Sequence, residues 1–287
     1  MDHPRLETIC LHLLRRCNLS CPHCWSHSSP SEDSELELNN ILVFLDTLVD
    51  YGLKHVSLSG GEPTLYSSII ELIQWCINRQ LSCTLTTNGV DTEKIAELIR
   101  FLVKLNYKIK ENLNIRISID GDKRWHDELR GSNTYVKALE TIGIIRKYQH
   151  WVGINSVTWL GFEKSLPKLV PVLIKEKVDD WALITETPAN ITERESFDFQ
   201  EALSRFNRCK KSIKLMEFPN NLTSWDYISW PQGGVVVESD GMVVLPGYGR
   251  MDDIVIGNIE HKLIVNLILE QIIPRINSGN SHFFFIK

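Results

Sequence analysis

The chain has 287 residues, of which 43% are apolar, with a formal net charge of −5 and an isoelectric point near 6.0. This mild acidity argues against a nucleic-acid backbone as the main partner, and no apolar run reaches the ~18 residues that span a bilayer. Seven cysteines without a secretory signal argue against a disulfide framework. We therefore expect a cytoplasmic protein of one large domain with an appendage, without nucleic acid or membrane partners.

Short β-rich runs alternate with helical periodicity along the chain, which predicts βα units and a parallel sheet. Helices are expected from about residue 38, from about residue 69 and near 92–104, 134–149, 165–176 and 193–208. Ser34 with Glu37 and Ser68 with Glu71 are interpreted as capping boxes of the first two helices. The strands are expected to begin near Thr8, Lys54, Ser82, Asn114, Val152 and Asp180.

Three cysteines are spaced Cys17-x3-Cys21-x2-Cys24 in the loop after the first expected strand. Three thiolates can hold three irons of a [4Fe-4S] cube and leave one iron open, whereas a closed cluster of this type takes four cysteines. Zinc, with His23 as a fourth ligand, is the alternative, but no second Cys-x2-Cys or His pair follows at zinc-finger spacing. The spacing therefore predicts one [4Fe-4S] cluster, with Cys17, Cys21 and Cys24 as the metal ligands.

Further motifs fall at the ends of later strands, where reactive groups gather in parallel βα architectures. Absent side chains at Gly60 and Gly61 let the backbone approach a ligand, although Gly-Gly-Glu-Pro alone is typical of an ordinary tight turn. Alternation places Ser118 and Asp120 on one side of the fourth strand. In chain order the motifs are Ser59-Gly60-Gly61-Glu62-Pro63-Thr64, Thr87-Asn88-Gly89, Ile117-Ser118-Ile119-Asp120-Gly121 and His126-Asp127 with Arg130-Gly131.

Together with the stretch 16–24, these motifs resemble the radical S-adenosylmethionine (SAM) superfamily over about residues 8–210. The resemblance is closest to the branch that carries C-terminal SPASM or twitch extensions. It implies an α/β fold: a partial (β/α)6 TIM-like barrel over 1–210 and a small α+β extension over 211–287. It also implies SAM as the second cofactor and a flavodoxin- or ferredoxin-type one-electron donor as a partner.

The resemblance further implies a cofactor-binding set. Glu62 would hold the ammonium group of SAM by a charge-assisted hydrogen bond. Ser118 and Asp120 would bind its ribose or carboxylate, with a structural Asp-Gly turn as the alternative. Arg130 would either neutralise the SAM carboxylate or cap a neighbouring loop. The full set is Gly60, Gly61, Glu62, Asn88, Ser118, Asp120, Arg130 and His23, the last standing where the family usually has an aromatic; Asn155 and Glu186 either face the same cavity or belong to the framework.

The other cysteines are interpreted by their surroundings. Cys10, Cys76 and Cys83 are expected to be small buried hydrophobes. Cys209 lies beside lysines that would lower a thiol pKa, and some peptide epimerases of the resembling branch use a late cysteine as hydrogen-atom donor. Cys209 is therefore the candidate catalytic residue, with an inert surface or interface thiol as the alternative. The basic run around it, Arg205, Arg208, Lys210, Lys211 and Lys214, is interpreted as a solvated helix face.

The C-terminal segment departs from the family pattern. Residues 233–246 and the turn 256–259 resemble the hairpin and Gly-Asn-Ile turn of SPASM extensions, but Leu245 stands where these carry the first ligand of an auxiliary cluster. No cysteine follows Cys209, so a second cluster has no thiolates.

The predicted function is reductive cleavage of SAM to methionine and a 5′-deoxyadenosyl radical, which abstracts hydrogen from a substrate, most favourably a ribosomally made peptide. The alternatives are the tailoring of a small molecule, such as a sugar, nucleoside or cofactor precursor, and a non-catalytic iron-sulfur protein.

Overall fold

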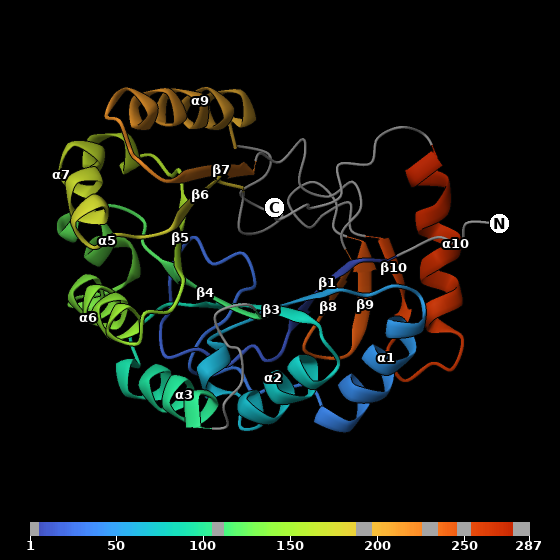
Figure 1. Ribbon diagram of the computed structural model, residues 1–287. Helices are drawn as coiled ribbons and strands as arrows, with labels where there is room; N and C mark the ends of the chain where they lie inside the picture. The colour runs from blue at the N-terminus through green and yellow to red at the C-terminus, as the bar shows by residue number, and fades with distance from the viewer. Residues whose placement is uncertain (1–5, 105–111, 188–196, 226–234, 246–253, 278–287) are drawn as a thin grey trace. The chain divides into compact units, whose positions relative to one another are not determined.

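The computed structural model describes residues 6–104, 112–187, 197–225, 235–245 and 254–277. The chain divides into two compact units (Figure 1). The first unit contains residues 1–17, 28–85 and 227–287, and the second contains 18–27 and 86–226.

The first unit is built on parallel strands that continue into a C-terminal hairpin. β1 (Thr8–His12) pairs in parallel with β2 (His55–Ser59) on one side and with β8 (Val235–Val237) on the other. β2 pairs in parallel with β3 (Ser82–Thr87), whose last two residues belong to the second unit. β9 (Met242–Leu245) pairs antiparallel with β8 and with β10 (Ile254–Asn258). The helices of this unit are α1 (Leu38–Asp50), the 3-10 helix η1 (Pro63–Leu65), α2 (Ile69–Asn78) and α10 (Ile264–Asn277).

The strands of the first unit have one apolar and one polar face. Ile9, Leu11, Val56 and Leu58 are fully buried and alternate with more polar residues along their strands. Figure 1 shows α1 and α2 side by side along these strands. The residues between the apolar ones along β1 and β2 are polar or sulfur-containing and mostly half-buried. Strands buried between two apolar layers have near-continuous apolar sequences, so this alternation shows that the second face serves something other than core packing.

The second unit contains four parallel strands in the order β4 (Leu113–Ser118), β5 (Val152–Val157), β6 (Asp180–Ile184) and β7 (Asn221–Trp225). Its core includes the fully buried Trp181, whose ring meets the edge of Phe162. Arg116 of β4 is also buried and pairs with Asp180 of β6. The helices are α3 (Thr92–Lys104), α5 (Lys123–Arg130), α6 (Thr134–Lys147), α7 (Phe162–Lys175) and α9 (Phe199–Leu215).

Most of the predicted elements are confirmed, and the differences lie at helix bounds and in three elements that were not predicted. The six predicted strands begin within one residue of the expected positions, whereas α5, β7 and α10 were not predicted. The helix expected near 193–208 is α9, which spans Phe199–Leu215; residues 193–196 lie outside the described part of the chain. Both capping boxes are wrong, because neither α1 nor α2 has a side-chain capping hydrogen bond. Glu37 is the N-cap residue of α1, and the Ser34 hydroxyl instead hydrogen-bonds the Ser239 hydroxyl at 2.8 Å.

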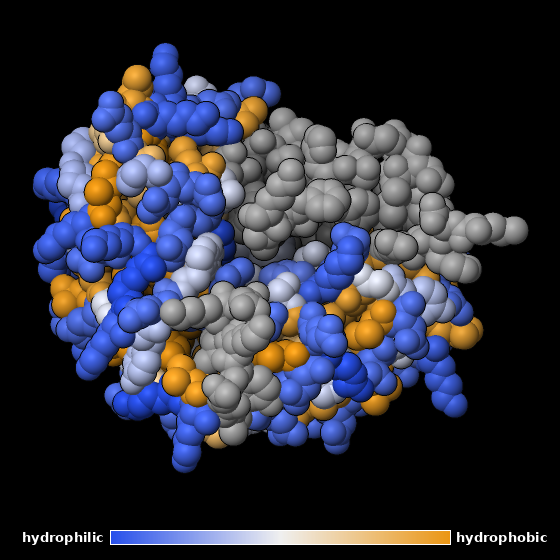
Figure 2. Space-filling view, viewed as in Figure 1, coloured by the Kyte–Doolittle hydropathy of each residue, from blue (hydrophilic) through white to orange (hydrophobic). Residues whose placement is uncertain are grey.

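The basic run of α9 is only partly the solvated face that was predicted. Lys211 and Lys214 are exposed, and the region of α9 is mostly hydrophilic in Figure 2. Arg205 is buried, because it donates to the Thr158 carbonyl at 2.8 Å and pairs with Glu186 at 2.6 Å. Among the described residues, no helix combines the length and the apolar character needed to cross a membrane.

Candidate cofactor site

The Gly-Gly-Glu-Pro turn after β2 lies directly against the backbone that leads to Cys17. The Gly61 amide donates to the Leu14 carbonyl at 2.6 Å, and the Glu62 amide donates to the Arg16 carbonyl at 3.0 Å. A Cβ atom at Gly61 would lie 2.2 Å from the Arg16 carbonyl oxygen. Gly60 has φ +125°, which favours glycine. The two glycines are therefore needed for this close approach of backbones.

The Glu62 carboxylate is buried and oriented. Glu62 is only 1% exposed. Its Oε1 accepts hydrogen bonds from the Thr64 amide at 3.1 Å and from the Thr64 hydroxyl at 2.8 Å. It acts as the N-cap of η1, which begins with Pro63. The local fold thus fixes one anionic group at the end of β2, as the sequence predicted.

Backbone hydrogen bonds hold all three cysteines of the motif, and Cys21 and Cys24 flank a tight turn. In the first unit, the Cys17 amide donates to the Ser29 carbonyl at 3.1 Å. In the second unit, the Cys24 amide donates to the Cys21 carbonyl at 3.0 Å, and the Cys24 thiol lies 3.4 Å from the Ser26 hydroxyl. Cys21 and Cys24 are half-buried and Cys17 is 9% exposed, whereas Cys76, Cys83 and Cys209 are completely buried.

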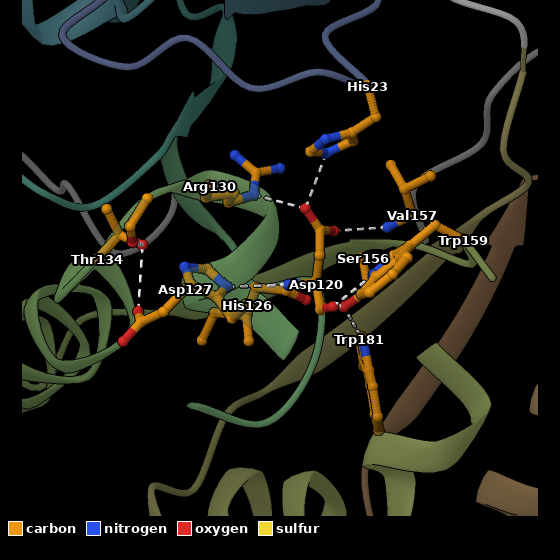
Figure 3. Close-up of polar contacts among 12 residues, drawn as sticks. His23, Asp120, His126, Asp127, Arg130, Thr134, Ser156, Val157, Trp159 and Trp181 are labelled. Atoms are coloured by element: carbon orange, nitrogen blue, oxygen red, sulfur yellow. Dashed lines mark hydrogen bonds and ion pairs between the residues drawn. The ribbon is translucent and has the colours of Figure 1, made fainter. Parts of the chain in front are cut away.

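Three of the predicted cofactor-binding residues converge in the second unit (Figure 3). The Asp120 carboxylate follows β4, His23 lies between Cys21 and Cys24, and Arg130 is the last residue of α5. Asp120 Oδ2 accepts from Arg130 Nε at 2.5 Å and from His23 Nε2 at 3.0 Å. The segment that carries two of the cysteines is therefore tied to the end of β4 through one carboxylate.

Asp120 is held from all sides by neighbouring strands. Its Oδ1 accepts from the Val157 amide at 2.8 Å, and its carbonyl accepts from Trp159 Nε1 at 2.7 Å. Behind it, Ser156 donates to the Ile119 carbonyl and accepts from Trp181 Nε1 at 2.9 Å. This brace was not predicted, because its members come from separate strands and carry no local motif. Both carboxylate oxygens of Asp120 are engaged within the protein.

Electrostatics keep Asp120 ionised. Complete burial alone would favour the neutral acid, but Arg130 and His23 lower the pKa of Asp120 far below its usual range. Burial likewise opposes the charged form of Arg130, yet Asp120 and Cys21 raise the pKa of Arg130. Burial also raises the pKa of the Cys21 thiol, while the Arg130 charge acts in the opposite direction. Arg130 is thus a permanent cation beside the cysteine turn.

His126 is a neutral buried base in the same group. It is 0% exposed, and its Nδ1 accepts from the Asp120 amide at 3.1 Å, which places the proton on Nε2. Nε2 has no hydrogen-bond partner among the described residues. Burial, together with the charge of Arg130, lowers the pKa of His126 to about 4. His126 is part of a motif noted in the sequence, but no role was predicted for it.

The remaining predicted residues lie at the same strand ends. The Asn88 side chain donates to Asn18 Oδ1 at 2.7 Å, so it contacts the cysteine loop. Ser118 is half-buried on the side of β4 that carries Asp120. Asn155 accepts from the buried Arg116 at 3.0 Å, and Glu186 pairs with Arg205 at 2.6 Å. The cofactor roles of these four residues stay predictions.

Cys209 has surroundings opposite to those predicted. It lies on the buried side of α9 with no exposed surface. Burial, with a smaller contribution from Glu163, raises the pKa of its thiol to about 12, so the expectation of a lowered pKa was wrong. Its role as a hydrogen-atom donor stays a prediction.

Three thiolates suit an open [4Fe-4S] cluster, because they can bind three of its irons and leave the fourth open. Cys21 and Cys24 are half-buried, and the charge of Arg130 acts on the Cys21 thiol. The described residues contain no group of three His, Cys, Asp or Glu side chains that could hold a single ion.

Comparisons with known proteins agree with this site. The family model of the radical SAM superfamily matches residues 11–166, more than half of the chain. The chain belongs to the radical SAM superfamily. A [4Fe-4S] cluster and SAM are the cofactors of this family, and we assign both to this chain.

Among curated relatives, Fe-coproporphyrin III synthase of Methanosarcina barkeri is 26% identical over 170 residues, which cover 58% of this chain and 40% of that protein. The sporulation killing factor maturation protein SkfB of Bacillus subtilis is 27% identical over 182 residues, which cover 63% of this chain and 39% of SkfB. The matched part thus spans about two fifths of each relative.

The crystal structure of Streptococcus suis SuiB bound to precursor peptide SuiA has a TM-score of 0.74 at 17% sequence identity. The match covers 97% of this chain and 67% of SuiB. This likeness establishes the fold class, the α/β architecture of radical SAM barrels.

We predict that Gly61→Ala destabilises the protein by about 2 kcal/mol or more, because the new methyl group would overlap the Arg16 carbonyl. Gly143→Ala is the matched control: it lies in α6 with no atom within 4 Å of the added carbon, and should stabilise by about 0.5–1 kcal/mol. Urea denaturation of both variants measures the difference. Equal stabilities would contradict the close backbone approach.

We predict that burial of neutral His126 makes the protein less stable in mild acid. Its pKa is about 4 in the folded protein against 6.5 in the unfolded chain, so the unfolded chain binds a proton first as the pH falls below 6.5. The contribution of neutral His126 to the free energy of unfolding is fully present above pH 6.5. The free energy of unfolding should therefore fall by about 2 kcal/mol by pH 5. His126→Asn should remove that part of the pH dependence. The check is the free energy of unfolding at pH 7.5 and pH 5 for both proteins; parallel pH profiles would exclude His126 as the cause.

Proposed function

We propose that this chain is a radical SAM enzyme that uses a single [4Fe-4S] cluster and modifies a peptide substrate. The observation that carries the proposal is the convergence of Asp120, Arg130 and His23 beside the cysteine turn, in a chain of this superfamily. Such a brace orients groups in advance at a strand end, where catalytic sites of parallel βα folds are found.

Cys17, Cys21 and Cys24 would bind the cluster through their thiolates. Arg130 supports this role, because its charge favours the thiolate form of Cys21 against the effect of burial. Asp120 offsets the cost of burying that cation. His23 is oriented by Asp120 between the two cysteines and would form part of the wall that surrounds the cofactors.

Glu62 and the glycines before it would bind the amino-acid part of SAM. The buried carboxylate is fixed by Thr64 and can accept a charge-assisted hydrogen bond from an ammonium group. Gly60 and Gly61 let the turn pack closely against the backbone of residues 13–16, which fixes Glu62 in place. Asn88 and Ser118 would contribute further polar contacts, and Arg130 is the cation available for the SAM carboxylate.

The chemistry that these cofactors supply when bound is one-electron cleavage of SAM to methionine and a 5′-deoxyadenosyl radical that abstracts hydrogen from substrate. The chain's own residues bind, orient and shield. His126 stays neutral at pH 7 and hydrogen-bonds the Asp120 amide, so it keeps the end of β4 in place. The electron would come from a flavodoxin- or ferredoxin-type donor.

The peptide substrate is supported by the likeness to SkfB, a maturation protein, and to SuiB, which was solved with its precursor peptide. Residues 211–287 would form a degenerate SPASM-type extension that includes the hairpin β8–β9. Leu245, which stands where such extensions carry a cluster ligand, is an apolar residue buried in β9. We propose one cluster for this reason.

A second candidate is the tailoring of a small molecule. The likeness to Fe-coproporphyrin III synthase favours it, because that relative is 26% identical over 170 residues. On this alternative the same cofactors would act on a cofactor precursor in place of a peptide.

Anaerobic reconstitution of the full chain should yield about four irons per chain and a protein that cleaves SAM when given a strong reductant. Cys17→Ala should lose both iron and cleavage, whereas Cys76→Ala, which removes a buried thiol of α2, should keep about four irons. Iron analysis and chromatography of 5′-deoxyadenosine measure the two properties. About eight irons would contradict the single cluster, and an intact cluster without cleavage would favour a non-catalytic protein.

Substrate class is decided by adding candidates to the reconstituted enzyme. We expect a short peptide encoded beside the gene to stimulate 5′-deoxyadenosine formation and to change in mass or stereochemistry. A tetrapyrrole precursor of iron coproporphyrin III is the matched small-molecule candidate and should do neither. Conversion of that precursor, with the peptide unchanged, would establish the second candidate.

A further inference from the structure

The polar face of the first unit forms an ordered array across three strands. Register places Cys10 of β1 beside Ser57 of β2, and Ser57 beside Thr84 of β3. Residues at alternate positions point to the same side of a strand, so His12 lies one step along from Cys10 on this face. We name Cys10, His12, Ser57, Thr84 and Glu238 the β1 thiol group.

Cys10 differs from the other cysteines outside the motif. It is half-buried, whereas Cys76, Cys83 and Cys209 are completely buried. The sequence interpretation of Cys10 as a small buried hydrophobe was therefore wrong. It failed because alternation within a short strand does not reveal which face is covered. Cys10 is a thiol that reagents can reach.

His12 links the thiol to a carboxylate. It follows Cys10 by two residues, is 5% exposed, and its Nδ1 lies 3.1 Å from Glu238 Oε2. Glu238 comes directly after β8, which pairs in parallel with β1. An activated cysteine nucleophile consists of a thiol, an imidazole beside it and a carboxylate that orients the imidazole. Cys10, His12 and Glu238 are these three groups in the same order.

The charges of the group agree with that arrangement. Burial alone would lower the pKa of His12, but interactions with Cys10 and then Glu238 raise it to about 9. His12 is therefore a cation at neutral pH, and it favours a negative charge on its neighbours. His55, the other titratable residue on this face of β2, is neutral because burial lowers its pKa to about 4.

Thr84 supplies an independent observation. It is 5% exposed, and its hydroxyl has no hydrogen-bond partner among the described residues. A buried hydroxyl without a partner destabilises a protein, because its lost hydrogen bonds to water are not replaced. It points to the same face as Cys10, two strands across, with the Ser57 hydroxyl between them. These hydroxyls are available to a ligand that accepts hydrogen bonds.

We propose that the β1 thiol group is a second reactive site, in which Cys10 is a nucleophile for an uncharged carbonyl compound such as an amide. The Thr84 and Ser57 hydroxyls would donate to the carbonyl oxygen. An uncharged ligand is favoured because the His12 cation is already paired with Glu238. The role of His12 and Glu238 is to position and activate the thiol.

The reaction with a carbon electrophile balances without any redox partner. The sulfur electron pair of Cys10 forms a carbon–sulfur bond, the bond to the leaving group breaks, and that group departs with its electron pair. The thiol proton passes to water as the bond forms, because His12 is already protonated, and the His12 charge stabilises the negative charge that develops on sulfur. With iodoacetamide as the probe, the leaving group is iodide and the amide carbonyl is the hydrogen-bond acceptor.

The proposal goes beyond the cofactor site, because neither SAM nor a cluster takes part in the alkylation. A protein that fails to cleave SAM can still show a reactive Cys10, and an active protein can lack one. The two proposals therefore fail independently.

The test is a time course of iodoacetamide labelling of the reconstituted full chain, with each cysteine followed separately by peptide mass mapping. Cys10 should be labelled at least about tenfold faster than Cys76, Cys83 and Cys209. His12→Asn should slow labelling of Cys10 about tenfold, whereas His55→Asn, on the same face, should leave the rate unchanged. Glu238→Gln is the second variant, should His12→Asn fail to fold, and should also slow it.

Thr84→Val separates carbonyl binding from general thiol reactivity. It should slow labelling by iodoacetamide but leave the rate with methyl methanethiosulfonate, which has no carbonyl group, unchanged. The proposal is overturned if Cys10 reacts no faster than the buried thiols, or if the His12 and His55 variants have the same effect. Equal effects of Thr84→Val on both reagents would overturn the assigned carbonyl ligand.

Discussion

The ion pair between Asp120 and Arg130 is the interaction on which the rest of the cofactor site depends. Neither charge is stable alone in a buried position, and each is retained because the other is present. The same carboxylate orients His23 through its second contact and receives the Val157 amide. One acidic side chain therefore sets the position of a helix end, a loop and a neighbouring strand. Its loss would leave Arg130 without the carboxylate that offsets its burial.

Much of the fold and part of the site follow from the sequence. The strand starts were predictable because a βα repeat leaves a clear change in hydrophobic period, as at Ser82 and Val152. The cysteine spacing and the glycines of the turn were also informative, since each reflects a local requirement. Gly60 illustrates this, because its φ of +125° is a requirement of the turn in which it lies.

Contacts between distant residues could not be predicted in the same way. The pairing of Glu238 with His12 joins residues 226 positions apart, and no local pattern announces it. Cys10 and Cys209 were both misjudged for this reason, because the neighbours that set exposure and pKa come from other elements. The capping boxes failed differently: the right residue types were present, but Ser34 found a partner in Ser239.

The burial of Cys21 has a consequence for how the protein acquires its cofactor. A thiol whose pKa is raised by burial holds its proton at neutral pH, so a metal centre can bind there only by displacing it. Maturation of the protein is then a proton-releasing reaction that competes with acidity. Arg130 lessens this competition without removing it. Lower pH therefore favours the protonated thiol over the thiolate that a metal centre requires.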